Sequence, residues 1–131
     1  MKTPPRVLIV EDEALIAMLI ERQLKNLGCT SVLKTASAED ALAKTEREDF
    51  DLVFMDIHLS GPMDGIEATR IIGSRQEHPR VAFMTAFGDQ ACRDESMQLG
   101  PLAFLEKPLS RDDIEGLLNA WEAEAASGTD G

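Results

Sequence analysis

The stretch LVFMDIHLSGPMDG, residues 52–65, decides the architecture of this chain. Its first four residues are all apolar, which indicates a strand covered on both faces, because a half-exposed strand would alternate apolar and polar residues. Asp56 ends this apolar run, and the turn-forming residues Ser60, Gly61 and Pro62 follow it. A strand of this kind belongs to a parallel sheet with helices on both sides, so its terminal carboxylate needs an explanation.

Strand and helix patterns alternate along the rest of the chain. Short apolar or β-branched runs predict strands at residues 6–10, 31–35, 51–55, 80–85 and 102–105. Helical spacing and capping signals predict helices at residues 14–27, 38–48, 64–75, 89–99 and 110–126. Strands that are each followed by a helix predict an α/β fold, a doubly wound, five-stranded parallel sheet with right-handed crossovers.

The ends of two predicted helices carry recognisable signals. Gly28 follows the first helix as a C-terminal cap, and Ser37 with Asp40 resembles a capping box that opens the second. Spacing at i, i+3, i+4 and i+7 predicts that the stretch before Gly28 is helical. The residues that recur with this spacing are Ile16, Leu19, Ile20, Gln23 and Leu27.

The composition restricts the partners of the protein. The 131 residues are enough for one domain, and their net charge of −11 argues against a nucleic-acid-binding surface, which needs clustered Lys and Arg. No apolar run has the length of a membrane span, and the first six residues do not resemble a signal peptide. We therefore expect a cytoplasmic protein that binds neither nucleic acid nor membrane. Cys29 and Cys92 lack metal-binding spacing and are expected to be reduced thiols.

Chemically useful side chains follow four of the predicted strands. Glu11 and Asp12 follow the first strand and Asp56 the third, while Thr85 ends the fourth and Lys107 follows the fifth. The functional crevice of a parallel α/β sheet lies outside the carboxyl ends of its strands. Each residue alone has an ordinary explanation, such as a helix-terminal acid, a turn residue or a solvated lysine. Their joint placement favours a functional site at one edge of the sheet.

Three neighbouring carboxylates repel one another unless a pKa shifts or a cation binds. Oxygen ligands of this kind suit Mg²⁺, with Mn²⁺ as a possible substitute. A cation and Lys107 would also neutralise a phosphoryl group brought to Asp56, which can act as a nucleophile and form an acyl phosphate. The hydroxyl of Thr85 could supply one more contact to the phosphoryl oxygens.

Four motifs in this order and spacing resemble the response-regulator receiver domain of two-component signalling. They are VLIVEDE (7–13), LVFMDIHL (52–59), AFMTAF (82–87) and AFLEKPL (103–109), and the likeness covers residues 5–126. The resemblance implies a flavodoxin-like (βα)5 sandwich with strand order 2-1-3-4-5. It also implies a receiver domain at residues 1–126 and a flexible C-terminal tail at 127–131, and we expect no output domain.

The resemblance assigns roles to the residues at the carboxyl edge. Asp56 would be the phosphoacceptor and nucleophile. Asp12 would ligate Mg²⁺ directly, Glu11 would do so through water, and the backbone carbonyl of His58 would complete the protein ligands together with Asp56.

Further roles are implied for the phosphoryl group and the switch. Thr85, Ala86 and Lys107 would contact the phosphoryl oxygens, and the Lys107–Pro108 peptide bond would be cis. On phosphorylation Thr85 would move toward the phosphate and Phe104 would rotate inward, remodelling the surface formed by the fourth helix, fifth strand and fifth helix. Phe104 could instead be an ordinary core residue.

The loop after Asp56 departs from the family pattern Asp-x-x-Met-Pro-x-Met-Asp-Gly. It is one residue longer, Ser60 occupies the position expected for proline, and Pro62 is displaced. The longer loop resembles small receivers paired with HWE-type histidine kinases. His58 and Phe87 are bulky residues beside the site, and we expect these gatekeepers to slow autodephosphorylation.

We therefore expect a stand-alone receiver that accepts a phosphoryl group from a histidine kinase or histidine phosphotransfer protein and binds a downstream protein. It would not be a conventional enzyme, and it would be a monomer or a phosphorylation-dependent dimer. A fragment of a longer regulator, a phosphorelay intermediate and a phosphate sink remain alternatives. Leu15, near the site, is a candidate partner contact, although core packing explains it nearly as well.

Three other functions are disfavoured. An aspartate phosphohydrolase would need a second Asp where His58 stands, and an FMN-binding protein would not place Glu11, Asp12 and Glu13 at its phosphate loop. A receiver with an inactive site would not be expected to retain Asp12, Asp56, Thr85 and Lys107.

Overall fold

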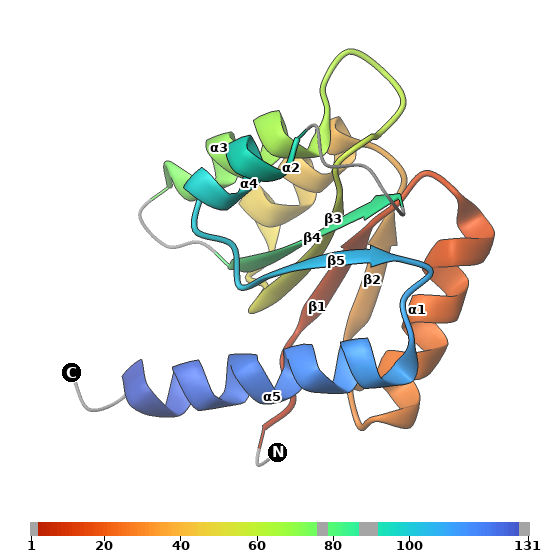
Figure 1. The fold of residues 1–131 in the computed structure, drawn as a ribbon, viewed down its shortest axis with the longest axis vertical. Helices are drawn as coiled ribbons and strands as arrows, with labels where there is room; N and C mark the ends of the chain where they lie inside the picture. The colour runs from red at the N-terminus through yellow and green to blue at the C-terminus, as the bar shows by residue number, and fades with distance from the viewer. Residues whose placement is uncertain (1–2, 76–78, 87–91, 129–131) are drawn as a thin grey trace.

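The computed structural model of the protein describes residues 3–75, 79–86 and 92–128, and in them strands and helices alternate along the chain (Figure 1). The strands are β1 (Val7–Val10), β2 (Val32–Thr35), β3 (Leu52–Asp56), β4 (Arg80–Ala86) and β5 (Ala103–Lys107). The helices are α1 (Ala14–Asn26), α2 (Ala38–Arg47), α3 (Gly65–Gly73), α4 (Arg93–Gln98) and α5 (Arg111–Gly128). All strand pairs are parallel and their order is β2-β1-β3-β4-β5, which confirms the predicted fold class.

The position of β3 in the middle of the sheet explains why its first four residues are all apolar. It pairs with β1 on one side and β4 on the other, and all five of its residues are buried. Val53 and Met55 contribute to the core beneath α2 and α3, whereas Leu52 and Phe54 contribute to the core beneath α1 and α5. Alternate side chains thus enter two different cores, so no position of the strand faces water.

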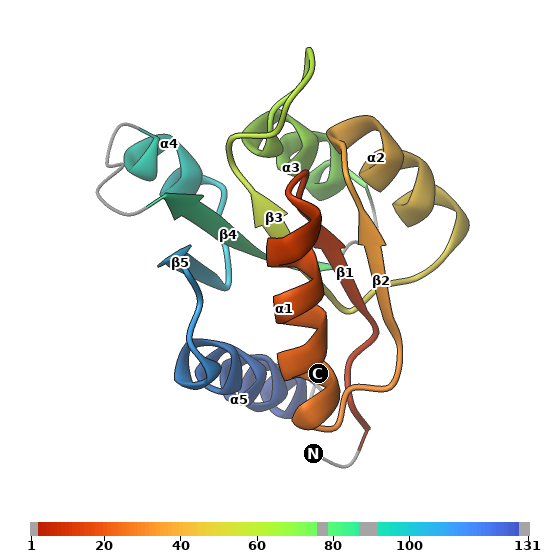
Figure 2. The same cartoon turned by 90° about the vertical axis from the view of Figure 1, so that its right-hand side faces the viewer.

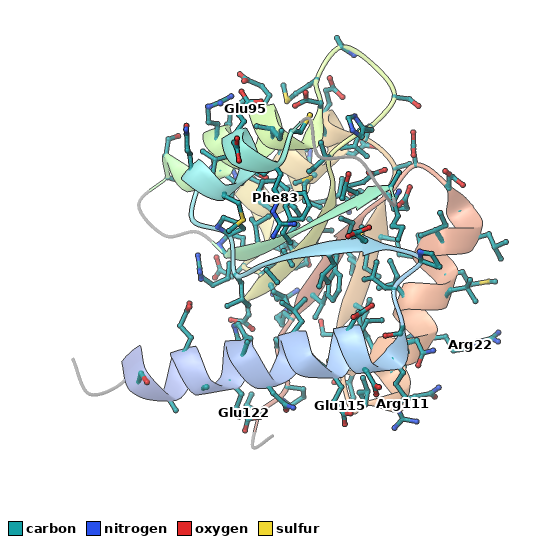
Figure 3. The ribbon with its side chains drawn as sticks, in the orientation of Figure 1. Arg22, Phe83, Glu95, Arg111, Glu115 and Glu122 are labelled. Atoms are coloured by element: carbon teal, nitrogen blue, oxygen red, sulfur yellow. The ribbon has the colours of Figure 1, made fainter. Side chains whose placement is uncertain are left out.

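Helices cover both faces of the sheet, as the views of Figures 1 and 2 show. Helices α2, α3 and α4 lie on one face, and α1 and α5 lie on the other. Figure 3 shows Phe83 of β4 between the sheet and the first group of helices, while Arg22 and Arg111 extend outward from the second group.

The buried face of α1 contains only part of the residues whose spacing predicted this helix. Its buried residues are Ala17, Ile20 and Leu24, whereas Leu19 is 49% exposed and Gln23 is only partly covered. A stripe at i, i+3 and i+7 beginning at Ala17 meets the sheet, which turns Leu19 to the helix's outer side. The helix is confirmed, but α1 carries two apolar stripes, and spacing alone does not select the buried one.

Several helix and strand ends differ from the predicted bounds by one or more residues, while the capping signals hold. Gly28 has a φ of 103°, and the Ser37 hydroxyl accepts a hydrogen bond from the Asp40 amide at 3.1 Å. Strand β5 continues to Lys107 because it stays paired with β4. Helix α5 continues to Gly128, two residues beyond the predicted helix end. Helix α4 begins at Arg93; the predicted start at residue 89 lies outside the described residues.

Candidate functional site

Asp56 is held at the end of β3 by a close approach of the chain. Its side chain is buried, and the first residue of α3, Gly65, donates its amide hydrogen to the carbonyl oxygen of Ile57 at 2.9 Å. A Cβ atom at Gly65 would lie only 2.0 Å from the carbonyl oxygen of Asp56. The Asp64–Gly65 pair therefore has two local roles, since the Asp64 side chain caps α3 and the glycine leaves room for the backbone of Asp56.

Three carboxylates meet at the carboxyl edge of the sheet. Glu11 and Asp12 follow β1, which pairs with β3, and one side-chain oxygen from each of Glu11, Asp12 and Asp56 can be chosen so that all lie within 4.8 Å of one another. Glu11 is 2% exposed and Asp12 is partly exposed. Burial raises the pKa of Glu11 to about 7, although hydrogen bonds from Lys107 and the Glu13 amide oppose this rise.

Lys107 places a positive charge beside two of these carboxylates. Its Nζ lies 2.9 Å from Oε1 of Glu11 and 3.3 Å from Oδ2 of Asp56. Burial disfavours the ammonium, but the hydrogen bond to Glu11 and the charge of Asp56 outweigh it, so the pKa of Lys107 lies above its ordinary value. Lys107 therefore stays charged and is shared between two acidic partners.

Asp12 has a different partner, which sequence analysis missed. The amide and the hydroxyl of Ser60 both donate to Oδ2 of Asp12, at 3.1 Å and 2.5 Å. The Ser60 hydroxyl is the main cause that holds the pKa of Asp12 below its ordinary value. The sequence identified Ser60 only as a departure from the family loop, because no local pattern links residues that are 48 positions apart.

Strands β4 and β5 bring the remaining predicted residues to the same edge. Ala86 is paired with Lys107 in the sheet register, and Thr85 is 1% exposed. The hydroxyl of Thr85 has no hydrogen-bond partner among the residues that the structure describes. A buried hydroxyl without a partner is costly, so it is available to a ligand at this edge.

The predicted switch and gatekeeper residues lie at different depths. Phe104 is partly buried in β5, and the guanidinium carbon of Arg93 lies 4.9 Å from the centre of its ring. The side chain of His58 is exposed, while its backbone amide donates to Oδ1 of Asp56 at 3.1 Å. Phe87 lies outside the described residues. The Lys107–Pro108 peptide bond is cis.

The side chains at this edge fit both Mg²⁺ and a phosphoryl group. Three convergent carboxylates, one of them with a raised pKa, offer hard oxygen ligands that gain from a divalent cation. The Lys107 ammonium and the unpartnered Thr85 hydroxyl offer donors for an anion at Asp56. The arrangement therefore suits Mg²⁺ together with a phosphoryl group.

Comparisons with known proteins place these features in context. Residues 7–119 match the family described as the response regulator receiver domain. The sporulation initiation phosphotransferase F of Bacillus subtilis is 34% identical over 116 residues, which cover 88% of this chain and 92% of that protein. The chemotaxis protein CheY of the same organism is 32% identical over 114 residues, covering 87% of this chain and 94% of CheY.

A longer relative and a solved structure agree with these matches. The transcriptional regulatory protein PdtaR of Mycobacterium tuberculosis is 35% identical over 111 residues, or 85% of this chain, and the match spans about half of PdtaR, 53% of its length. The crystal structure of the N-terminal domain of a response regulator/sensory box/GGDEF protein from Carboxydothermus hydrogenoformans superposes with a TM-score of 0.82 at 25% identity. That superposition covers 92% of this chain and 97% of the other.

Proposed function

The chain belongs to the response-regulator receiver family, and from this premise we propose that it accepts a phosphoryl group on Asp56 from a histidine kinase or a histidine phosphotransfer protein. One observation carries the proposal. The carboxylates of Glu11, Asp12 and Asp56 converge within 4.8 Å, and the Lys107 ammonium lies 3.3 Å from Asp56. A nucleophilic carboxylate beside a fixed cation and two further acidic ligands is suited to phosphoryl transfer.

In the proposed reaction a carboxylate oxygen of Asp56 attacks the phosphorus atom of phosphohistidine. The new O–P bond forms as the P–N bond breaks, and the imidazole leaves with its electron pair. Asp12, Asp56 and the His58 carbonyl would hold Mg²⁺, and Glu11 would hold it through water. The bound cation supplies charge neutralisation for the carboxylates and the phosphoryl oxygens.

Lys107, Thr85 and Ala86 are proposed to receive the phosphoryl oxygens. Lys107 shares its ammonium between Glu11 and Asp56, so a small movement would transfer one of its hydrogen bonds to a phosphoryl oxygen. The Thr85 hydroxyl gives up no hydrogen bond to a described residue when it turns toward the phosphate. The absence of a hydrogen bond to be broken supports the proposed switch, in which Phe104 follows Thr85 inward and remodels the α4-β5-α5 surface that binds a downstream protein.

The phosphodonor is proposed to dock beside α1. Leu15, Met18 and Leu19 of this helix are 63%, 39% and 49% exposed, and a hollow of about 440 Å³ lies between α1 and the segment carrying Lys107 and Pro108. An exposed apolar helix next to the phosphoacceptor suits a helical partner that must bring its histidine to Asp56.

Several finer features remain proposals. Among the described residues no helix is long and apolar enough to cross a membrane, and we propose a cytoplasmic location. We also propose a stand-alone receiver, monomeric or dimerising on phosphorylation, that serves an HWE-type kinase and loses its phosphoryl group slowly. A relay intermediate is the second candidate, because the phosphotransferase F of Bacillus subtilis is matched over 92% of its length.

The central test uses acetyl phosphate and Mg²⁺ with the full chain. Wild type is expected to gain the mass of one phosphoryl group, to lose this gain when EDTA replaces Mg²⁺, and to bind beryllofluoride under the same conditions. Asp56→Asn should gain nothing while unfolding as cooperatively as wild type. A wild type that is not labelled, or a label that persists in Asp56→Asn, would overturn the proposal.

A further inference from the structure

Ser60 makes two hydrogen bonds to one oxygen of a proposed metal ligand. Its amide and its hydroxyl both donate to Oδ2 of Asp12, at 3.1 Å and 2.5 Å. Both hydrogen bonds from Ser60 therefore reach the same oxygen, and neither reaches Oδ1 of Asp12. A carboxylate held through one oxygen has a restricted orientation, so its second oxygen keeps a defined direction.

The loop that carries Ser60 is anchored on both sides of it. Ile57 is fully buried and Leu59 is 8% exposed, so apolar side chains fix the segment before Ser60 in the core. Gly61 follows with a φ of 103°, which lets the chain turn away directly after Ser60. The loop then returns to Gly65, whose amide donates to the Ile57 carbonyl at 2.9 Å. Ser60 is therefore placed over Asp12 by the loop's own packing.

The residue type matters at this position. Proline, which the family pattern has here, possesses neither an amide hydrogen nor a hydroxyl and could make neither bond. Serine supplies both donors in a loop that is one residue longer. The departure from the family pattern and the contact with Asp12 thus occur at the same residue.

We propose that Ser60 is a positioning residue for the divalent cation, which orients the Asp12 carboxylate so that its second oxygen faces the metal. The inference rests on the proposed function, since it concerns the Mg²⁺ site of that reaction. Groups that orient a metal ligand through hydrogen bonds change the affinity for the metal without touching it. Holding Asp12 in place before the cation arrives removes part of the ordering cost of binding.

The test measures Mg²⁺ affinity directly, with no phosphodonor present. Isothermal titration of the metal-free full chain with Mg²⁺ gives the Kd, and thermal unfolding without Mg²⁺ checks each fold. Ser60→Ala removes the hydroxyl and is expected to raise the Kd about three- to ten-fold, near the lower end of the usual effect because Asp12 is partly exposed. Ser60→Pro removes both donors and should raise the Kd further.

Two variants separate positioning from general effects of substitution. Ser60→Thr keeps both donors and should retain a Kd within about two-fold of wild type, since the hydrogen bonds can still form. Ser74→Ala removes an exposed hydroxyl that donates to the Ile71 carbonyl in α3, at 2.7 Å, and should leave the Kd unchanged.

The outcomes distinguish the two proposals. A wild type that binds no Mg²⁺ would overturn the proposed function. A wild type that binds Mg²⁺ as tightly as Ser60→Ala, or more weakly than it, would overturn the positioning role alone. A wild type that binds Mg²⁺ more weakly than Ser60→Ala would mean that Ser60 competes with the cation for the Asp12 carboxylate. A Ser60→Thr variant as weak as Ser60→Ala would likewise contradict positioning by the hydroxyl.

Discussion

Replacing Gly65 with alanine tests how the fold presents its phosphoacceptor. The added Cβ would lie 2.0 Å from the carbonyl oxygen of Asp56, 2.9 Å from its carbonyl carbon and 3.0 Å from Cγ of Met55, whereas Cβ atoms essentially never approach closer than 3.0 Å. The nearest atoms belong to the backbone of the buried central strand, so they cannot move aside as a flexible side chain would. Either α3 or the end of β3 must shift by about 1 Å.

The expected cost follows from this overlap. Overpacking of a buried site costs about 1–3 kcal/mol, and an obstacle made of backbone places Gly65→Ala at the upper end of that range. For a domain of this size the melting temperature should fall by about 10 °C. Because the shift acts on Asp56 itself, the rate of labelling by acetyl phosphate should fall as well.

Helix α3 supplies a matched control at its other end. Gly73 is the last residue of the same helix, and a Cβ there would meet nothing within 4 Å. Gly73→Ala should therefore raise stability by about 0.5–1 kcal/mol through helix propensity. Thermal unfolding followed by circular dichroism measures both variants. A Gly65→Ala variant that melts within about 2 °C of wild type and is labelled at the same rate would refute the steric argument.

Three other predictions concern the charge of Glu11, the restraint on Phe104 and the lifetime of the acyl phosphate. Burial raises the pKa of Glu11 from 4.5 to about 7, so the folded protein holds a proton that the unfolded chain releases, and stability should fall as the pH rises across that interval. Glu11→Gln should show a smaller fall in unfolding free energy between pH 5 and pH 8; an identical fall would contradict the assignment. Arg93→Ala removes the cation over the Phe104 ring, and should accelerate acetyl phosphate labelling about two- to five-fold if this contact of about 0.5–1 kcal/mol restrains the switch. Equal rates would exclude that restraint. The double variant His58→Asn, Phe87→Glu should shorten the half-life of the acyl phosphate, and an unchanged half-life would argue against gatekeeping.

The fold could be predicted because its pattern is local. Each strand of the sheet contains a short apolar or β-branched run, and each is followed by helical spacing or a cap, so the α/β alternation is visible without tertiary information. The candidate site follows from the same pattern. Parallel strands end at a common edge, so residues at or directly after their ends, such as Glu11, Asp56 and Lys107, must come close together.

Other features depended on how distant segments pack. The spacing of α1 allowed more than one buried stripe, and contact with the sheet selected Ala17 and Leu24 over Leu19. The Lys107 ammonium lies 2.9 Å from Glu11 and 3.3 Å from Asp56, and which of the two it approaches more closely depends on small shifts at the end of β5. Apolar periodicity predicts that a helix has a buried face, but it does not determine which residues are buried or which neighbours they contact.

The loop of residues 57–64 shows most clearly which features the sequence predicts and which depend on tertiary packing. Its sequence alone determined that a turn follows Asp56 and that Ser60 replaces a proline of the family pattern. Only the tertiary structure decided that Ser60 binds Asp12 and that Gly65 must leave room for the backbone of Asp56. The physical reason is that apolar runs, helical spacing and turn residues are local properties of the sequence, whereas a loop's contacts depend on the path that the buried residues on either side impose on it.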